Sequence, residues 1–568
     1  MYRSTFTGLN TSSQGVNIAQ RQLDVTAHNI SNANVTGYSR QRYITQAVPP
    51  KGWNSQFAYP ERGKPGGGVE TLSLDQIRDL FLDRQFRNEQ TSTTYWETRS
   101  NAMYYIEDVF NSIDSNSLDG VLASFFASLQ ELSKNSTDEA VRTNVVSEAK
   151  KIVDVFHVYD EQLTNLMEQQ NFQMHEKVIH ANQLLTQIAA LNDSIFRFEL
   201  GGSTANDLRD QRANMLDELS SLMDISYEEK SAEPPMYNIY GLELTQLRIV
   251  AGSDLTNEDA VLVDHLDSYM LKLEAIEHGS GENEIYDLLE PLPDSEYESP
   301  FDKPFYKIFL SGSEDPPNPE ANVYDGEHNG IELISYDEST GEGLLGYTGG
   351  LLQSYLDVRD GVGTVDDVPG VIGIPYYIKE LNRFVESFTT AFNEIHSQGY
   401  TYPTGIGGSS DTGVDFFDPE LTTARTIQLS QAILESSFNI AASRNEAVTL
   451  DPEGHAQTGN NEIILELIQR IKEGVIEGLG NSPEGFYKNY LGIVASEASA
   501  ANDMYTQKEV MLSDVQKQRT SVSSVSEDEE MTNMVRFNHA YNASARCITT
   551  IDEMLDKLIN GTGRVGLV

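Results

Sequence analysis

The chain has 568 residues, of which 39% are hydrophobic, and a formal net charge of −48 at pH 7. This length exceeds the roughly 250–300 residues that one hydrophobic core usually serves, so we expect several domains. The excess of acidic residues argues against nucleic acid and against an anionic membrane as partners. No apolar run reaches the ~18 residues of a transmembrane helix, and the N-terminal stretch lacks the basic start and apolar core of a cleavable signal peptide.

The negative charge is concentrated in the middle of the chain. Residues 226–345 hold 28 acidic and 5 basic residues, a net charge of −23, whereas residues 1–50 carry +3 and residues 531–568 carry +1. Segments that pack against copies of themselves avoid like-charge repulsion, while a surface that meets only water can carry any charge that keeps it soluble. The distribution therefore favours self-association through the two ends and an acidic, solvent-facing middle.

Apolar residues recur every seven positions at both ends of the chain, which predicts a helix with one apolar stripe at each end. The N-terminal stripe consists of Leu9, Val16, Leu23 and Ile30. The C-terminal stripe consists of Met534, Tyr541, Ile548 and Leu555, with Phe537, Ile551 and Leu558 at the positions three residues later. The two helices either pair with each other, parallel or antiparallel, or pack separately on their own domains.

The first helix ends in a segment rich in asparagine. Asn29, Asn32 and Asn34 fall within six positions, and Gly37 follows them. Asparagine tolerates the left-handed conformation that ends helices and bonds to nearby backbone, and glycine supplies a second permissive position. We therefore expect a helix stop, a self-capping loop, and then an extended run from Tyr38 to Val48.

Helical periodicity dominates the region between the ends. Steps of three and four residues link Leu74, Ile77 and Phe81 and continue to residue 110, and further helices are expected over 375–398, 461–479 and 484–520. The clearest pattern lies within 139–198, where the stripe from Val145 to Ile195 corresponds to about 75 Å of continuous helix. A helix of that length is typical of a rod.

The pattern changes to short β-like runs between residues 236 and 335. These runs are 236–242, 247–252, 260–264, 269–276, 305–312 and 330–335, and turn-forming residues separate them. They predict a β-rich insert in the helical rod. A loop rich in Gly, Thr and Ser at 400–415 marks a second small outer module over 400–460.

Together these patterns predict a multidomain α plus β protein, an elongated helical rod with paired terminal coiled-coil helices and an inserted β-rich domain. The terminal domain is expected over 1–50 and 527–568, and the rod over 51–225 and 346–526. The acidic insert is expected over 226–345.

No motif of catalysis or of metal or cofactor binding is evident. The chain has no phosphate-binding Gly-rich loop with lysine, no nucleophile elbow and no metalloprotease helix motif. His175 and His180 are five positions apart, so they do not share a helix face as i, i+4 ligands do. The one cysteine, Cys547, excludes an internal disulfide. We therefore name no catalytic, cofactor-binding or metal-ligating residue and expect no enzyme.

The segment LDVTAHNISNANVTGYSRQRY, residues 23–43, resembles the N-terminal motif of the bacterial flagellar rod, hook and hook-associated proteins. The matching loop residues are Asn29, Asn32, Asn34, Gly37, Tyr38, Ser39, Arg40 and Gln41. Val35 and Thr36 stand where the family often has Thr-Pro, so a rigid proline is missing. The segment from Ser524, with Asp528-Glu529-Glu530 ahead of a helix, is similar to the family's C-terminal motif. The tripeptide Ser39-Arg40-Gln41 and the stretches 205–222 and 348–361 favour the hook-associated branch.

The resemblance implies a structural axial subunit of the flagellum that joins hook to filament as a ring. The expected partners are copies of the chain itself, the hook protein, a second hook–filament junction protein, and a cytoplasmic export chaperone at the C-terminal helix. The resemblance also implies secretion through the flagellar type III channel, without a cleaved signal, to the extracellular flagellum. The terminal stripes would then be the subunit-assembly surfaces, which order on assembly.

Two other classes of function stay open. The acidic insert at 226–345 is an alternative site for a binding or hydrolytic activity carried on a flagellar scaffold, which requires convergent polar groups in a pocket. A cytoplasmic coiled-coil sensor requires a ligand-binding or kinase module, and the sequence shows none.

Overall fold

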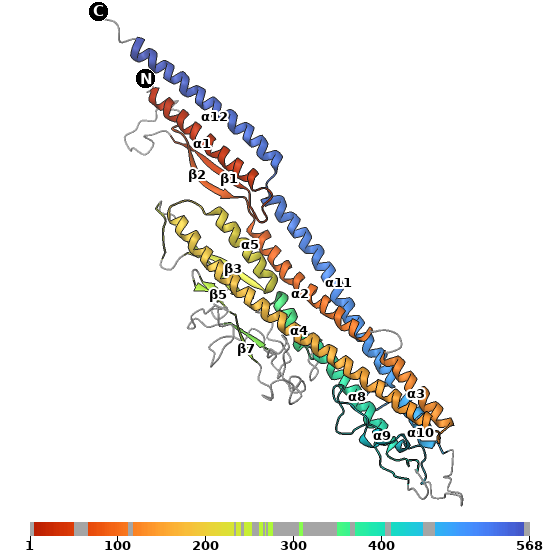
Figure 1. Cartoon of the computed structure of the whole chain (residues 1–568). Helices are drawn as coiled ribbons and strands as arrows, with labels where there is room; N and C mark the ends of the chain where they lie inside the picture. The colour runs from red at the N-terminus through yellow and green to blue at the C-terminus, as the bar shows by residue number, and fades with distance from the viewer. Residues whose placement is uncertain are drawn as a thin grey trace, which may run out of the picture.

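The computed structural model describes residues 5–49, 66–111, 117–231, 235–239, 244–252, 261–264, 267–268, 271–275, 306–310, 349–363, 370–403, 410–446 and 460–561. Its elements form an elongated rod, and both chain ends lie at the same tip (Figure 1). The predicted fold class, a helical rod with paired terminal helices and an inserted β region, is confirmed. None of the described helices is long and apolar enough to cross a membrane.

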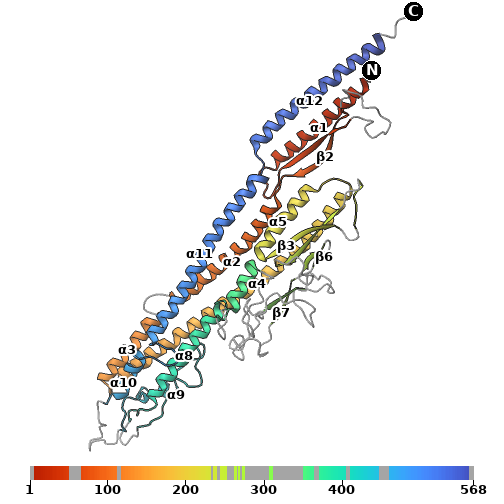
Figure 2. The same ribbon diagram turned by 180° about the vertical axis from the view of Figure 1, so that it is seen from behind.

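The terminal helices α1 (Thr5–Ser31) and α12 (Glu527–Asp556) lie side by side at this tip, and the two views agree on it (Figures 1 and 2). A last π-helical turn, η3 (Lys557–Gly561), extends α12. Strands β1 (Gln41–Val48) and β2 (Gly68–Gln76) form an antiparallel ribbon that packs on α1. The extended run predicted after the asparagine loop is therefore confirmed as β1.

The next part of the rod is built from long helices. Helix α2 (Leu80–Asn111) packs along α11 (Pro483–Ser523), and α4 (Glu139–Leu200) is continuous over 62 residues, about 90 Å. The predicted long helix is thus confirmed. The prediction of helix from Leu74 to Phe81 is wrong in its first part, because Leu74 lies in β2 and the helix begins only at Leu80.

The far end of the rod has an aromatic-rich core. It joins α3 (Leu118–Lys134), the first half of α4, α8 (Ile374–His396), α10 (Glu462–Leu467) and the start of α11. Helix α10 continues into a π-helical turn, η2 (Ile468–Lys472). The segment with α9 (Gln431–Glu435) and η1 (Ser437–Asn439) places its apolar residues in this same core. The described residues of the second small outer module predicted over 400–460 thus share the core of the rod.

A second core lies where the insert meets the rod. It joins the second half of α4, α5 (Asn206–Leu222), α7 (Gly350–Asp360) and the strands of the insert. Strands β3 (Ile225–Ser231), β4 (Thr245–Ala251), β5 (Val261–Asp264) and β6 (Asp267–Ser268) form one antiparallel sheet, and β7 (Leu271–Ala275) pairs with β8 (Tyr306–Leu310).

Four predicted β runs have counterparts in the strands β4, β5, β7 and β8. Only residues 236–239 of the first run are described, and they hold one bridged residue, Tyr237, but no strand. The run at 330–335 lies outside the described residues. The boundary at residue 50 is also corrected. It assigns β2 to the rod, although β2 pairs with β1 in the terminal unit.

Candidate assembly site at the chain ends

Helices α1 and α12 run antiparallel in one constant register. A Cβ built on Gly8 would lie 3.3 Å from Ile551 Cδ1, and one built on Gly15 would lie 2.9 Å from Ser544 Oγ. A step of seven residues forward in α1 therefore matches a step of seven residues back in α12. The two glycines permit close approach of the helices, because any larger side chain would push them apart.

The predicted stripe residues lie along this pair but are only partly covered. Ten of them are of intermediate exposure, namely Leu9, Val16, Leu23, Ile30, Met534, Phe537, Tyr541, Ile548, Ile551 and Leu555. Leu558 is 57% exposed in the π-helical turn after α12. The structure thus joins the two stripes as an antiparallel pair, one of the arrangements that periodicity left open.

The two helices are covered to different extents. Helix α1 contacts both α12 and the β1–β2 ribbon. It buries Ala19, three places after Val16 in the predicted stripe, and Ile18, which the stripe analysis missed. Among the described residues of α12, only Glu530 is buried. Helix α12 therefore packs on one side only.

Exposed apolar side chains form two groups on this pair. Met531 and Val535, one turn apart at the start of α12, are 55% and 57% exposed. Met554 and Ile559 near its end are 54% and 68% exposed, and the antiparallel register brings Phe6, 65% exposed, beside them. Because exposed apolar patches are often covered by protein–protein contacts, these two groups make the terminal pair a candidate assembly site.

The asparagine loop is held by one buried side chain. Asn29 Nδ2 donates to the carbonyl oxygen of Gln41 at 2.9 Å and to Glu530 Oε2 at 3.2 Å. Its Oδ1 accepts from the Gln41 amide at 3.0 Å and from the Tyr38 hydroxyl at 2.8 Å. The pKa of Tyr38 is raised, first by burial and then by nearby carboxylates. Asn29 therefore closes the loop and also ties it to α12.

Of the other two asparagines, one caps the helix and the other is exposed. Asn32 donates to the His28 carbonyl at 3.0 Å and caps the helix end, whereas Asn34 is exposed. Gly37 has a φ of +76°, and a Cβ there would collide with Asn214 of α5. The prediction of a self-capping loop with a permissive glycine is confirmed, and the close approach to α5 adds a second reason for the glycine.

The tripeptide Ser39-Arg40-Gln41 connects the terminal pair to the rod. The Ser39 amide and hydroxyl donate to the Asp210 carboxylate of α5 at 2.9 and 2.7 Å, and Gln41 Nε2 donates to Asp207 at 2.7 Å. Burial raises the pKa of Asp210, and the hydrogen bonds from Ser39 oppose that rise. We call this tripeptide the connector.

Arg40 links the connector to both C-terminal helices. Its guanidinium contacts Glu529 and the buried Glu530 of α12, each at 2.7 Å, and its amide donates to the Ser523 carbonyl at the end of α11 at 2.9 Å. Charge-assisted hydrogen bonds to a buried carboxylate are the stronger kind. The connector therefore binds α5, α11 and α12 at one point. Sequence reasoning missed the partners in α5, for which the only signal was the family-like stretch 205–222.

Three family models match parts of the chain. "Flagella basal body rod protein" matches residues 9–38, "Flagellar hook-associated protein FlgK helical domain" matches 103–287, and "Flagellar basal body rod FlgEFG protein C-terminal" matches 516–561. Flagellar hook-associated protein 1 of Bacillus subtilis is 31% identical over 99% of this chain and 99% of its own length. The chain belongs to the flagellar hook-associated protein 1 family.

Further relatives agree with this membership. Flagellar hook-associated protein 1 of Salmonella typhimurium is 25% identical over 97% of this chain, and that of Escherichia coli is 24% identical over 97%. The solved structure of the flagellar hook junction protein FlgK from Burkholderia pseudomallei covers 78% of this chain and 100% of its own, with a TM-score of 0.51 and 13% identity. That likeness supports the fold.

Proposed function

We propose that the chain is a structural subunit of the bacterial flagellum that joins hook to filament, and that it assembles with copies of itself through α1 and α12. Family membership supports the flagellar role. The partly covered pair of terminal helices carries the assembly proposal, because α12 packs on one side and leaves its other side to neighbouring molecules.

Burial of the exposed side chains supplies a driving force for assembly. Covering one large apolar side chain contributes roughly 1.5–3 kcal/mol, so the two apolar groups together favour association over an isolated chain. The near-neutral charge of both ends, +3 over residues 1–50 and +1 over residues 531–568, opposes this association little.

The proposed partners are copies of the chain, the hook protein, the second hook–filament junction protein and an export chaperone. The chaperone would cover α12 before export, because α12 exposes apolar side chains that the isolated chain leaves uncovered. We further propose export through the flagellar channel to the extracellular flagellum. The role requires no catalysis. Among the described residues, no group of three His, Cys, Asp or Glu side chains is arranged to hold a metal ion.

The test introduces a charge into each apolar group. In the bacterium that carries this chain, Val535→Asp and Met554→Asp should each lower the number of filaments attached to hooks. The reason is that burial of an unpaired carboxylate in an apolar contact is strongly unfavourable. The matched control is Thr550→Asp, an exposed residue of the same helix whose hydroxyl bonds only to the Arg546 carbonyl of its own helix. Electron microscopy of the cells counts hooks with and without filaments. Normal filaments in both variants would refute assembly through α12.

A further inference from the structure

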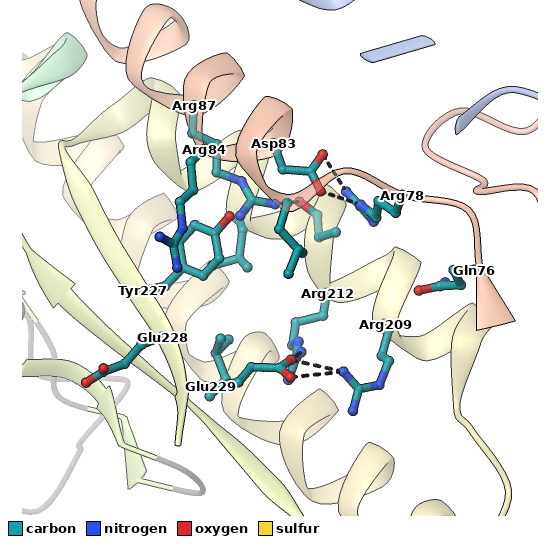
Figure 3. A pocket seen from close by; sticks show the side chains of 14 residues that line it. Gln76, Arg78, Asp83, Arg84, Arg87, Arg209, Arg212, Tyr227, Glu228 and Glu229 are labelled. Atoms are coloured by element: carbon teal, nitrogen blue, oxygen red, sulfur yellow. Dashed lines mark hydrogen bonds and ion pairs between the residues drawn. The ribbon is translucent and has the colours of Figure 1, made fainter. Parts of the chain in front are cut away.

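A pocket rich in arginine lies between the rod and the insert, close to the connector. It has a volume of about 360 Å³ and is lined by the start of α2, by α5, and by strands β3 and β4 (Figure 3). Five lining residues are arginines, namely Arg78, Arg84, Arg87, Arg209 and Arg212. Leu80, Leu216 and Leu247 supply an apolar wall. Such a concentration of guanidinium groups is unexpected in a chain with a net charge of −48.

Four of these arginines already have carboxylate partners. Arg78 contacts Asp83 at 2.6 Å and Arg87 contacts Asp217 at 2.7 Å. Arg209 and Arg212 share Glu229, at 3.0 and 2.5 Å. These ion pairs hold α2, α5 and β3 together, and they fix the shape of the pocket.

Arg84 differs from the other four. It is exposed, and within the described part of the chain it has no carboxylate partner. Its guanidinium carbon lies 5.6 Å from the ring centroid of Tyr227, and Figure 3 shows the two side chains next to each other. The Tyr227 hydroxyl is buried and has no hydrogen-bond partner among the described residues. The pocket therefore offers one accessible donor group without a carboxylate partner among the described residues, the Arg84 guanidinium held against the Tyr227 ring.

This arrangement suits a carboxylate side chain. A guanidinium binds a carboxylate through two parallel hydrogen bonds, and contact with an aromatic ring limits the conformations that Arg84 can adopt. The leucine wall suits the methylene groups of a glutamate.

We propose that this pocket binds a carboxylate side chain of a second copy of the chain. The proposal rests on the proposed function, because only a subunit that assembles with itself meets its own acidic surface at high local concentration. Charge complementarity supports this occupant, since Arg84 has no carboxylate partner among the described residues and the chain has 87 acidic residues and 39 basic ones. The pocket also adjoins the connector, because Arg78, which lines it, contacts Asp210, the partner of Ser39. Contact here would fix a neighbouring copy relative to both the rod and the terminal pair.

The experiment uses zero-length cross-linking in intact flagella. Arg84→Lys keeps the positive charge and supplies an amine, which a carbodiimide joins only to a carboxylate in direct contact. Flagella isolated from cells that carry this variant should give a dimer of the chain on a denaturing gel, and peptide mass spectrometry should place the joined amine at position 84. The matched control is Arg197→Lys, on an arginine that is 75% exposed and pairs with Asp193 of its own helix. The control should give no dimer joined at its substituted position.

A second variant tests the contribution of the contact to assembly. Arg84→Glu should weaken association of the chain with the hook tip about tenfold, the loss expected for one charge-assisted contact, whereas Arg197→Glu should leave it unchanged. A cross-link confined to one chain, or no dimer from flagella that contain the Arg84→Lys chain, would overturn the proposal. That result would leave assembly through α12 untouched, because Val535→Asp and Met554→Asp test α12 separately.

Discussion

Removing the Asn29 side chain is the most direct test of how the asparagine loop fixes the chain ends. Asn29 is 1% exposed and makes four hydrogen bonds, two to the Gln41 backbone, one to Tyr38 and one to Glu530. The Asn29→Ala change removes all four at once. It leaves the amide and carbonyl of Gln41 without these partners, and Gln41 is itself buried.

The expected loss follows from those contacts. Each buried polar group left without a partner costs about 1–3 kcal/mol, and the costs of neighbouring groups do not add fully. Glu530 keeps its ion pair with Arg40, and the Tyr38 hydroxyl keeps His28 Nδ1 at 3.0 Å, so Gln41 dominates the loss. We therefore expect the free energy required to open the terminal unit to fall by about 2–4 kcal/mol.

Hydrogen exchange read by mass spectrometry on the full chain measures this opening locally. Amides of α1 and β1 should exchange roughly 30- to 1,000-fold faster in Asn29→Ala, whereas amides of α4 should not change. The control is Asn34→Ala, in the same loop, where the exposed side chain makes no hydrogen bond to the described residues. An increase below about threefold in α1 would refute the argument that Asn29 closes the loop.

Three further predictions concern the helix pair and the rod. Gly15→Leu should separate α1 from α12, because even a Cβ there would lie 2.9 Å from Ser544 Oγ, and hydrogen exchange should rise in both helices. Burial lowers the pKa of His396 to about 4, so between pH 6.5 and 4 the unfolded chain binds a proton that the folded chain does not. Stability to urea should fall by up to about 3 kcal/mol as the pH falls through that window, and His396→Leu should lose this dependence. Arg142→Met should cost about 3 kcal/mol in urea unfolding, because the buried guanidinium, whose pKa burial lowers to about 10, donates to backbone carbonyls of the 436–440 segment.

Each of these has a result that would contradict it. Unchanged exchange in Gly15→Leu, with Gly492→Leu as a control where a Cβ meets nothing within 4 Å, would show that close contact does not hold the pair. An equal pH dependence in the wild type and in His396→Leu would assign the slope to other groups. Unfolding of Arg142→Met at the wild-type urea concentration would show that the carbonyls find other donors.

Local signals in the sequence were enough to predict the secondary structure at the chain ends. Heptad spacing of Leu9 and Val16 predicted the first helix, and the asparagine cluster predicted its end, because both signals act over a few residues. The family motif singled out Ser39, Arg40 and Gln41 but did not predict that they connect the terminal pair to the rod. The same kind of local signal gave a wrong prediction at Leu74. Its spacing to Ile77 and Phe81 is helical, but Leu74 lies in β2, which is held extended by pairing with β1.

The way in which distant segments meet could be read only from the folded chain. A heptad stripe has the same period in both directions, so it leaves the direction of pairing open, and the close approach at Gly8 and Gly15 sets the antiparallel register. The net charge of the chain does not predict which carboxylate pairs with which arginine. The fold brings Asp210 to Ser39 and leaves Arg84 without a carboxylate among the described residues, because such pairings depend on positions in space rather than on distance along the chain.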